Sequence, residues 1–179
     1  ALAIGVSCLA GGNNSVALTS GPKDKITLCV DLSGSMSMNF FNISRAQAAK
    51  QAMDKIILAS NSRETQYGLV SFTHEAYQVH PMGHPYAHFL TTQFQPTGGT
   101  NMYYGLQKTL AQDPTRVIVL SDGETPMQDS CLELARNSFV PKRIKIDTIA
   151  IGEAYDRFLQ DLSELTGGHF QRASNPEEL

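Results

Sequence analysis

The sequence predicts an α/β protein of the doubly wound, Rossmann-like class. We expect a three-layer sandwich with a mostly parallel central sheet, one short antiparallel edge strand and helices on both faces. Two observations predict this class. Short apolar runs alternate along the chain with longer segments of helical periodicity. Polar, glycine-containing loops follow two of those runs. Alternating strands and helices imply right-handed crossovers, which build a parallel sheet that is covered on both faces.

The first predicted strand, residues 26–30, is a largely apolar run bounded by charged residues, as expected for a strand buried within a parallel sheet. Only three residues separate the predicted strand 67–72 from residues 76–79, which favours an antiparallel edge hairpin. The later predicted strands are residues 117–120, 144–151 and 169–172.

Residues 44–60 predict the longest helix. Ser44 and Gln47 fit a capping box, and one apolar stripe follows, formed by Ala46, Ala49, Met53, Ile56 and Ile57. A helix over residues 128–138 would turn Cys131, Leu134 and Ala135 inward. A helix over residues 155–166 would bury Phe158, Leu162 and Leu165 and end at Gly167. Two further helices are predicted over residues 86–92 and 101–111.

The two ends of the sequence differ from this pattern. Residues 1–22 form an N-terminal extension, which we interpret as a β-hairpin turning at Gly11-Gly12-Asn13-Asn14 rather than as the remnant of a targeting segment. Residues 23–179 form the predicted domain. Asn175-Pro176-Glu177-Glu178 has the pattern of a helix start, so we expect the domain to be cut at its last helix and to be a module of a longer chain.

Composition restricts the possible partners. A chain of 179 residues with 41% hydrophobic and 17% charged residues suits one globular domain. The net charge of −3, without a run of Lys or Arg, argues against nucleic acid or an anionic membrane as the main partner. No apolar stretch approaches the ~20 residues needed to cross a bilayer. The three widely spaced cysteines form neither a disulfide framework nor a CxxC pattern, which favours a reducing compartment, with Cys29 buried as a small hydrophobe.

Three loops carry the candidate functional residues. Asp31, Ser33 and Ser35 follow the first predicted strand, Thr100 follows Gly98-Gly99, and Asp122 follows the strand 117–120. In doubly wound sheets, ligands bind beyond the carboxyl ends of the strands, where the strand order reverses. Carboxylates and hydroxyls are hard oxygen donors, which suit Mg²⁺ or Mn²⁺ better than Ca²⁺, and the absence of His and Cys argues against zinc. Because hydroxyls are neutral, an ion that they hold keeps much of its charge and can bind an external carboxylate.

The segments DLSGS, TGGTN and SDGE resemble the three parts of the metal-ion-dependent adhesion site of von Willebrand factor A domains, and the resemblance extends from about Lys25 to Leu179. It implies that Ser33 and Ser35 bind Mg²⁺ directly and that Thr100 binds it directly or through water. Asp31 and Asp122 would act mainly through bridging water. A Glu or Asp of a partner protein would fill the open coordination position. The implied function is non-enzymatic protein binding in adhesion or scaffolding, within a larger protein or complex.

Two alternatives remain. A phosphotransferase of the haloacid dehalogenase type also has an Asp after its first strand, but it needs a second Asp where this chain has Ser33. A domain of the same family could instead bind its partners without metal. Each motif taken alone is also an ordinary turn, since Gly, Ser and Asp are the usual turn residues.

Two other groups of residues invite a functional interpretation. His80, His84 and His88 recur every four residues, but Pro81 and Pro85 disfavour a shared helical face, so we expect a surface loop rather than a metal site. Four apolar residues follow the first metal loop, and they suit either packing or an apolar rim for a partner: Met36, Met38, Phe40 and Phe41. Glu124 and Asp129 are interpreted as a solvated loop residue and a helix start.

Overall fold

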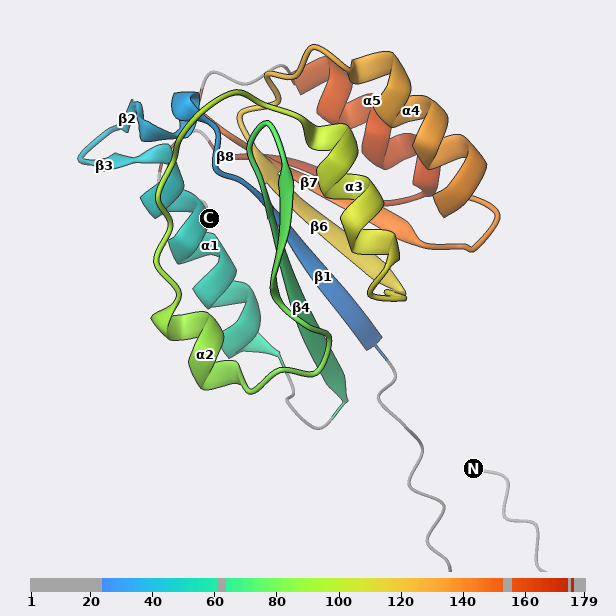
Figure 1. Ribbon diagram of the computed structural model, residues 1–179, viewed down its shortest axis with the longest axis horizontal. Helices are drawn as coiled ribbons and strands as arrows, with labels where there is room; N and C mark the ends of the chain where they lie inside the picture. The colour runs from blue at the N-terminus through green and yellow to red at the C-terminus, as the bar shows by residue number, and fades with distance from the viewer. Residues whose placement is uncertain (1–23, 61–63, 153–155, 174, 176–179) are drawn as a thin grey trace, which may run out of the picture.

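A computed structural model describes residues 24–60, 64–152, 156–173 and 175 (Figure 1). Within these residues the predicted strands and helices are present, with ends that differ by a few residues. The strands of the main sheet are β1 (Asp24–Asp31), β4 (Thr65–Phe72), β5 (Ala76–His80), β6 (Arg116–Ser121), β7 (Lys145–Ile151) and β8 (Phe170–Ala173). The helices are α1 (Arg45–Ala59), α2 (Tyr86–Thr91), α3 (Met102–Leu110), α4 (Gln128–Leu134) and α5 (Asp156–Thr166). Helix α4 continues into a π-helical turn, η2 (Ala135–Phe139).

The main sheet confirms the predicted doubly wound class. Its strand order is β5-β4-β1-β6-β7-β8; β5 pairs antiparallel with β4, and the other pairs are parallel. From β1 the chain proceeds to β4 on one side, and from β6 it proceeds to β7 on the other. The strand order therefore reverses between β1 and β6, the position where doubly wound sheets bind ligands. The carboxyl ends of these two strands are Asp31 and Ser121.

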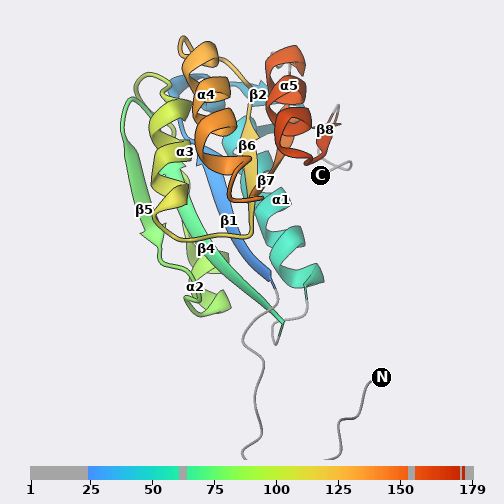
Figure 2. The same cartoon turned by 90° about the vertical axis from the view of Figure 1, so that its right-hand side faces the viewer.

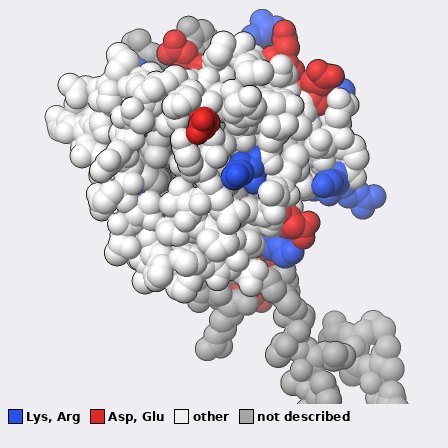
Figure 3. Space-filling model, viewed as in Figure 1, with Lys and Arg blue, Asp and Glu red and all other residues white. Residues whose placement is uncertain are grey.

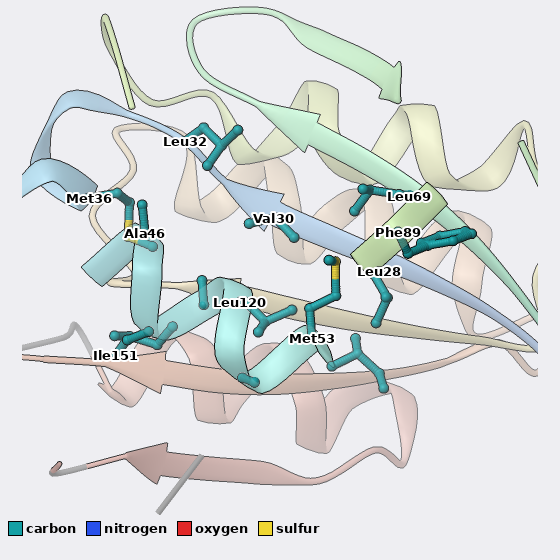
Figure 4. Packing of buried hydrophobic residues seen from close by; sticks show 14 of the residues in the cluster. Leu28, Val30, Leu32, Met36, Ala46, Met53, Leu69, Phe89, Leu120 and Ile151 are labelled. Carbon is teal, nitrogen blue, oxygen red and sulfur yellow. The ribbon is translucent and has the colours of Figure 1, made fainter. Parts of the chain in front are cut away.

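Alternating side chains of the strands pack against two layers of helices. Leu28 and Val30 of β1 belong to a core beneath α1 and α2, whereas Cys29 between them packs on the opposite face beneath α3, α4 and α5. Figure 2 shows the helices on the two sides of the sheet. In Figure 4, Met53 and Ala46 of α1 lie over Val30, Leu120 and Ile151 of the sheet. These two cores fix the strand ends that carry the candidate site.

The segment between β1 and α1 contains structure that the sequence pattern did not predict. A 3-10 turn, η1 (Gly34–Ser37), is followed by a small hairpin of β2 (Asn39–Phe40) and β3 (Ile43–Ser44). The predicted capping box of Ser44 and Gln47 is present and begins α1. The packing interpretation of the apolar cluster is confirmed for two of its residues, and the partner rim stays a prediction for the other two. Met36 and Phe40 are buried in the core, while the side chains of Met38 and Phe41 are 54% and 67% exposed.

The rings of the three histidines lie in contact with one another. The ring of His80, at the end of β5, stacks on His84 with a centroid distance of 4.7 Å, and the rings of His84 and His88 lie 4.4 Å apart. The prolines do prevent one continuous helix, as predicted, and a turn between β5 and α2 brings the three rings together. Among the described residues the three rings do not form a group that could hold a metal ion.

Some predictions lie outside the described residues. These are the hairpin of residues 1–22 and the helix start at Pro176, Glu177 and Glu178. Within the described part of the chain, every helix is too short or too polar to cross a membrane.

Candidate metal centre

Three loops meet at the carboxyl end of β1. The N–H group of Leu32 donates to the carbonyl oxygen of Phe72 at the end of β4, with an N–O distance of 2.8 Å. The loop before α3 crosses the same segment: Gly34 N–H donates to Gly98 O at 2.9 Å, and Thr97 N–H donates to Leu32 O at 2.8 Å. The segments DLSGS and TGGTN, more than 60 residues apart in sequence, are thus joined by their own backbones.

Asp31 is fully buried, and both of its carboxylate oxygens accept hydrogen bonds. Oδ1 accepts from the backbone N–H of Ser33 at 2.8 Å, and Oδ2 accepts from the hydroxyl of Ser121 at 2.6 Å. Burial raises the pKa of Asp31 from 3.8 to about 6; the hydrogen bonds from Ser121 and Ser33 lower it, and the negative charge of Asp122 raises it further. The raised pKa means that the surroundings of Asp31 stabilise its negative charge less well than water does. A bound cation would supply that stabilisation.

The two serines of the first loop present their hydroxyls together. Ser33 Oγ and Ser35 Oγ lie 3.1 Å apart. Ser33 is buried, and Ser35 is partly exposed. The alternate spacing in sequence and the 3-10 turn that starts at Gly34 place both oxygens on one side of the loop.

Thr100 lies in the crossing loop and is half-buried. Gly98, two residues before it, has φ +69°, a backbone conformation that glycine adopts without strain. A Cβ at Gly98 would also lie 3.1 Å from His74 Nδ1. On the other side of Thr100, Asn101 N–H donates to Thr73 O at 2.6 Å, and the Asn101 side chain caps α3. The position of Thr100 is therefore fixed from both sides.

Asp122 follows β6 and is buried. Its Oδ1 accepts from the N–H of Glu124 at 3.3 Å, and its Oδ2 lies 2.9 Å from Arg45 Nη1. Arg45 is the first residue of α1 and is itself only 9% exposed. The pair is a buried salt bridge between a residue of the candidate site and a helix that begins 77 residues earlier.

The structure thus gathers all three predicted loops, and it adds two residues that the sequence argument did not assign to the site. One is Ser121, whose hydroxyl also accepts from Gly123 N–H at 2.8 Å and so links Asp31 to the third loop. The other is Arg45. In the sequence Arg45 is only a basic residue after the helix cap Ser44, and its burial beside Ala48, Ala49 and Ala52 is seen only in the structure.

The donor set suits a hard divalent cation. Two carboxylates and three hydroxyls lie on three loops that contact one another, and all five residues offer oxygen. Among the described residues, no three His, Cys, Asp or Glu side chains come together as a metal site, so a softer metal held by nitrogen or sulfur has no comparable site there. Asp31 and Asp122 hold fixed hydrogen bonds, which suits contact with an ion through water.

Solved structures share this fold. An aerotolerance-related membrane protein from Bacteroides fragilis superposes with a TM-score of 0.69 at 14% identity, over 86% of this chain and 94% of that one. The SpRpn10 VWA domain superposes with a TM-score of 0.66 at 19% identity, over 83% of this chain and 86% of that one. At these identities the likeness concerns the fold alone.

Sequence comparison finds relatives and a family. Calcium-activated chloride channel regulator 1 of Mus musculus is 29% identical over 156 residues, 80% of this chain and 16% of its own length. Calcium-activated chloride channel regulator 3A-1 of the same species is 31% identical over 157 residues, again 80% of this chain and 16% of its own. The chain spans about a sixth of the length of these relatives. Residues 26–124, more than half of the chain, match the von Willebrand factor type A domain, and the chain belongs to that family.

Proposed function

We propose that this domain is a metal-dependent protein-binding module. In this proposal Ser33, Ser35 and Thr100 hold one Mg²⁺ through their hydroxyls, and Asp31 and Asp122 hold it mainly through water. Mn²⁺ would fit the same donors. The bound ion supplies a Lewis acid with an open coordination position, and a Glu or Asp of a partner protein fills it. Members of the von Willebrand factor type A family are typically protein-interaction modules, which supports the general class.

One distance carries the proposal. Mg²⁺ takes octahedral oxygen ligands at about 2.1 Å, so neighbouring ligand oxygens lie about 3 Å apart. The hydroxyl oxygens of Ser33 and Ser35 share a hydrogen bond and lie 3.1 Å apart, which is also the spacing of two neighbouring ligands of Mg²⁺. The same two oxygens could therefore accept an ion on their shared side with little movement of the loop.

The charges of the site support an acidic partner. Counted as formal charges, Asp31 and Asp122 contribute −1 each and Arg45 contributes +1, so the three residues together carry one negative charge. A divalent ion would change this to one positive charge, in a site where Asp31, Ser33 and Asp122 are buried. A partner carboxylate would then neutralise the site, and burial would strengthen its attraction to the ion.

In this proposal the domain binds a partner and does not act as a phosphotransferase of the haloacid dehalogenase type. A haloacid dehalogenase mechanism needs a second carboxylate two residues after Asp31, and that position is the hydroxyl of Ser33. Phosphatase turnover with p-nitrophenyl phosphate that disappears in Asp31→Asn would contradict this part of the proposal.

Two measurements test the function. Calorimetry should detect one Mg²⁺ per chain, and Ser33→Ala should weaken the affinity at least tenfold without loss of the circular dichroism spectrum. Ser130→Ala, on α4, is the matched control and should bind Mg²⁺ as the wild type does. A pull-down in Mg²⁺, in EDTA and with Ser33→Ala as bait should then retain a partner only on the wild type in Mg²⁺. The same proteins in all three lanes would overturn the proposal.

A further inference from the structure

An open hollow of about 440 Å³ lies beside the candidate metal site. It is bordered by the β2–β3 hairpin, the start of α1, the residue after β7 and the end of β8; its lining residues are Met38, Asn39, Phe40, Phe41, Arg45, Gly152 and Arg172. Two of these seven residues are arginines and none is acidic. Each arginine is ion-paired with an acid outside the lining, Arg45 with Asp122 and Arg172 with Asp156, so the hollow is distinguished by its guanidinium N–H donors rather than by an excess of positive charge.

Arg45 is shared by the hollow and the metal site. Its Nη1 donates to Asp122 on one side, while its Nε is buried and has no hydrogen-bond acceptor among the described residues. Gly152 lies against that nitrogen, since a Cβ there would be only 2.7 Å from Nε. A buried donor without an acceptor is costly, and although a ligand in the hollow would not reach Nε itself, a negative charge held nearby would offset part of that cost.

Arg172 supplies donors at the rim. Its guanidinium contacts the Asp156 carboxylate and the carbonyl oxygen of Gly152, and 40% of its side chain is exposed. A guanidinium has five N–H donors in a planar fork, so two contacts do not exhaust it. Arg172 is thus held in place by the protein while it still presents a charged edge to solvent.

The other side of the hollow is apolar and projects from the molecule. Phe41, at the turn of the hairpin, has φ +58° and packs edge-to-face on the buried Phe40. Left-handed backbone is uncommon for a residue with a large side chain. Figure 3 shows no charged side chain on the projection where Figure 1 places β2 and β3. An exposed aromatic residue fixed on a rigid neighbour, beside a charged groove, is typical of a protein-binding surface.

From these contacts we infer that the hollow binds a second carboxylate of the same partner segment, next to the one that fills the metal. The partner is an acidic segment with at least two Asp or Glu residues a few positions apart and an apolar side chain that packs on Phe41 and Met38. Arg172 binds the second carboxylate directly. Arg45 contributes positive charge beneath it and links the two subsites. This inference rests on the proposed metal-dependent function and specifies its ligand.

A displayed library of ten-residue peptides with one fixed central Glu tests both the metal-dependent function and the second carboxylate site in the hollow. Selection on the wild-type domain in Mg²⁺ should enrich a second Asp or Glu and an apolar residue close to the fixed Glu. The strongest peptide is then synthesised with and without its second acid. Arg172→Gln should weaken the two-acid peptide about tenfold, the usual size of a charged hydrogen bond. The same variant should change binding of the one-acid peptide less than twofold.

Matched control variants distinguish the loss of a charged or apolar binding contact from a general loss of folding. Arg136→Gln removes an exposed arginine from the far helix layer and should leave both affinities unchanged, and Arg172→Lys should keep part of the two-acid preference. Phe41→Ser should weaken binding several-fold, whereas Leu58→Ser, an equally exposed position on α1, should not. All variants should retain the wild-type circular dichroism spectrum.

The possible failures are distinguishable. A selection that yields nothing in Mg²⁺ beyond what it yields in EDTA contradicts the metal-dependent function. Magnesium-dependent peptides with no second acid, or two-acid peptides that bind equally to Arg172→Gln, leave that function intact and overturn the inference about the hollow.

Discussion

Arg45 Nη1 lies 2.9 Å from Asp122 Oδ2, and both side chains are almost completely buried. The pair joins the start of α1 to the loop after β6, so this ion pair links the first helix directly to the candidate metal site. Replacing one partner of such a pair leaves a buried charge without compensation, which costs about 3–5 kcal/mol. Two changes to this region give predictions about stability, and two changes to the site give predictions about metal and pH.

We expect Arg45→Met to lower the free energy of unfolding by about 3–5 kcal/mol in urea denaturation without metal. The double variant Arg45→Met/Asp122→Asn should recover much of that loss, because the stranded negative charge is removed. If the losses of the two single variants simply add, the two residues are not coupled as their distance indicates.

Gly152→Ala should destabilise the fold more than Gly167→Ala does. Both glycines have positive φ, +80° and +71°, so both substitutions carry a backbone cost of about 1–2 kcal/mol. Only at Gly152 would the new Cβ meet the Arg45 side chain, because nothing lies within 4 Å of the Gly167 position. Thermal unfolding of the two variants measures the difference, and Arg45→Met should abolish it. Equal losses in the two variants would count against the contact.

Removal of metal should lower the melting temperature. An ion that binds only the folded state stabilises it by mass action, by about 2.7 kcal/mol when its concentration is one hundred times the dissociation constant. For a domain of this size, that corresponds to a rise of about 5–10 °C. Scanning calorimetry in Mg²⁺ and in EDTA should show this shift for the wild type and little of it for Ser33→Ala. An unchanged wild-type melting temperature at saturating Mg²⁺ would contradict binding to the folded state.

The raised pKa of Asp31 predicts a pH dependence of defined sign. The folded protein holds the Asp31 proton up to a pKa of about 6, whereas the unfolded chain releases it near 3.8. The contribution of Asp31 to stability is therefore greatest below pH 3.8 and is lost as the pH rises through about 6. At pH 7 the loss is on the order of 3 kcal/mol.

In EDTA, Asp31→Asn should therefore be more stable than the wild type at pH 7.5, and the difference should shrink at pH 5. Urea unfolding midpoints of both proteins at the two pH values measure this difference. Protons should also compete with Mg²⁺, so that Mg²⁺ affinity falls below about pH 6. A wild-type minus Asp31→Asn difference that does not change with pH would contradict the shifted pKa.

The sheet and its loops were predictable because they depend on local and periodic signals. Asp31 and Asp122 each follow an apolar strand, and the reversal of strand order between β1 and β6 brings parallel strand ends together wherever this topology forms. Gly98 and Gly99, before Thr100, likewise predict a sharp turn of the backbone at this loop. These signals predicted the positions of the three loops, while the binding of an ion by Ser33, Ser35 and Thr100 stays a prediction.

The contacts that could not be predicted depend on tertiary geometry. Nothing in the sequence separates a buried Arg45 from a solvated arginine at a helix start, because its partner lies 77 residues away. The β2–β3 hairpin consists of two-residue strands, too short for an alternating pattern to identify. The rings of His80, His84 and His88 meet because of how α2 folds back on β5, which spacing alone does not reveal.

Because Cys29 and Cys131 are buried, the rate at which a reagent labels their thiols measures how often the domain opens locally. Burial raises the pKa of both thiols, that of Cys131 to about 12, so neither forms an appreciable amount of reactive thiolate in the folded state. In a Cys8→Ser background, a maleimide reagent should modify them only when the sheet separates from α3, α4 and α5. Their labelling rate would report how often α3, α4 and α5 separate from the sheet. A slower rate in Mg²⁺ would show that an ion bound at the edge of the sheet makes this separation less frequent.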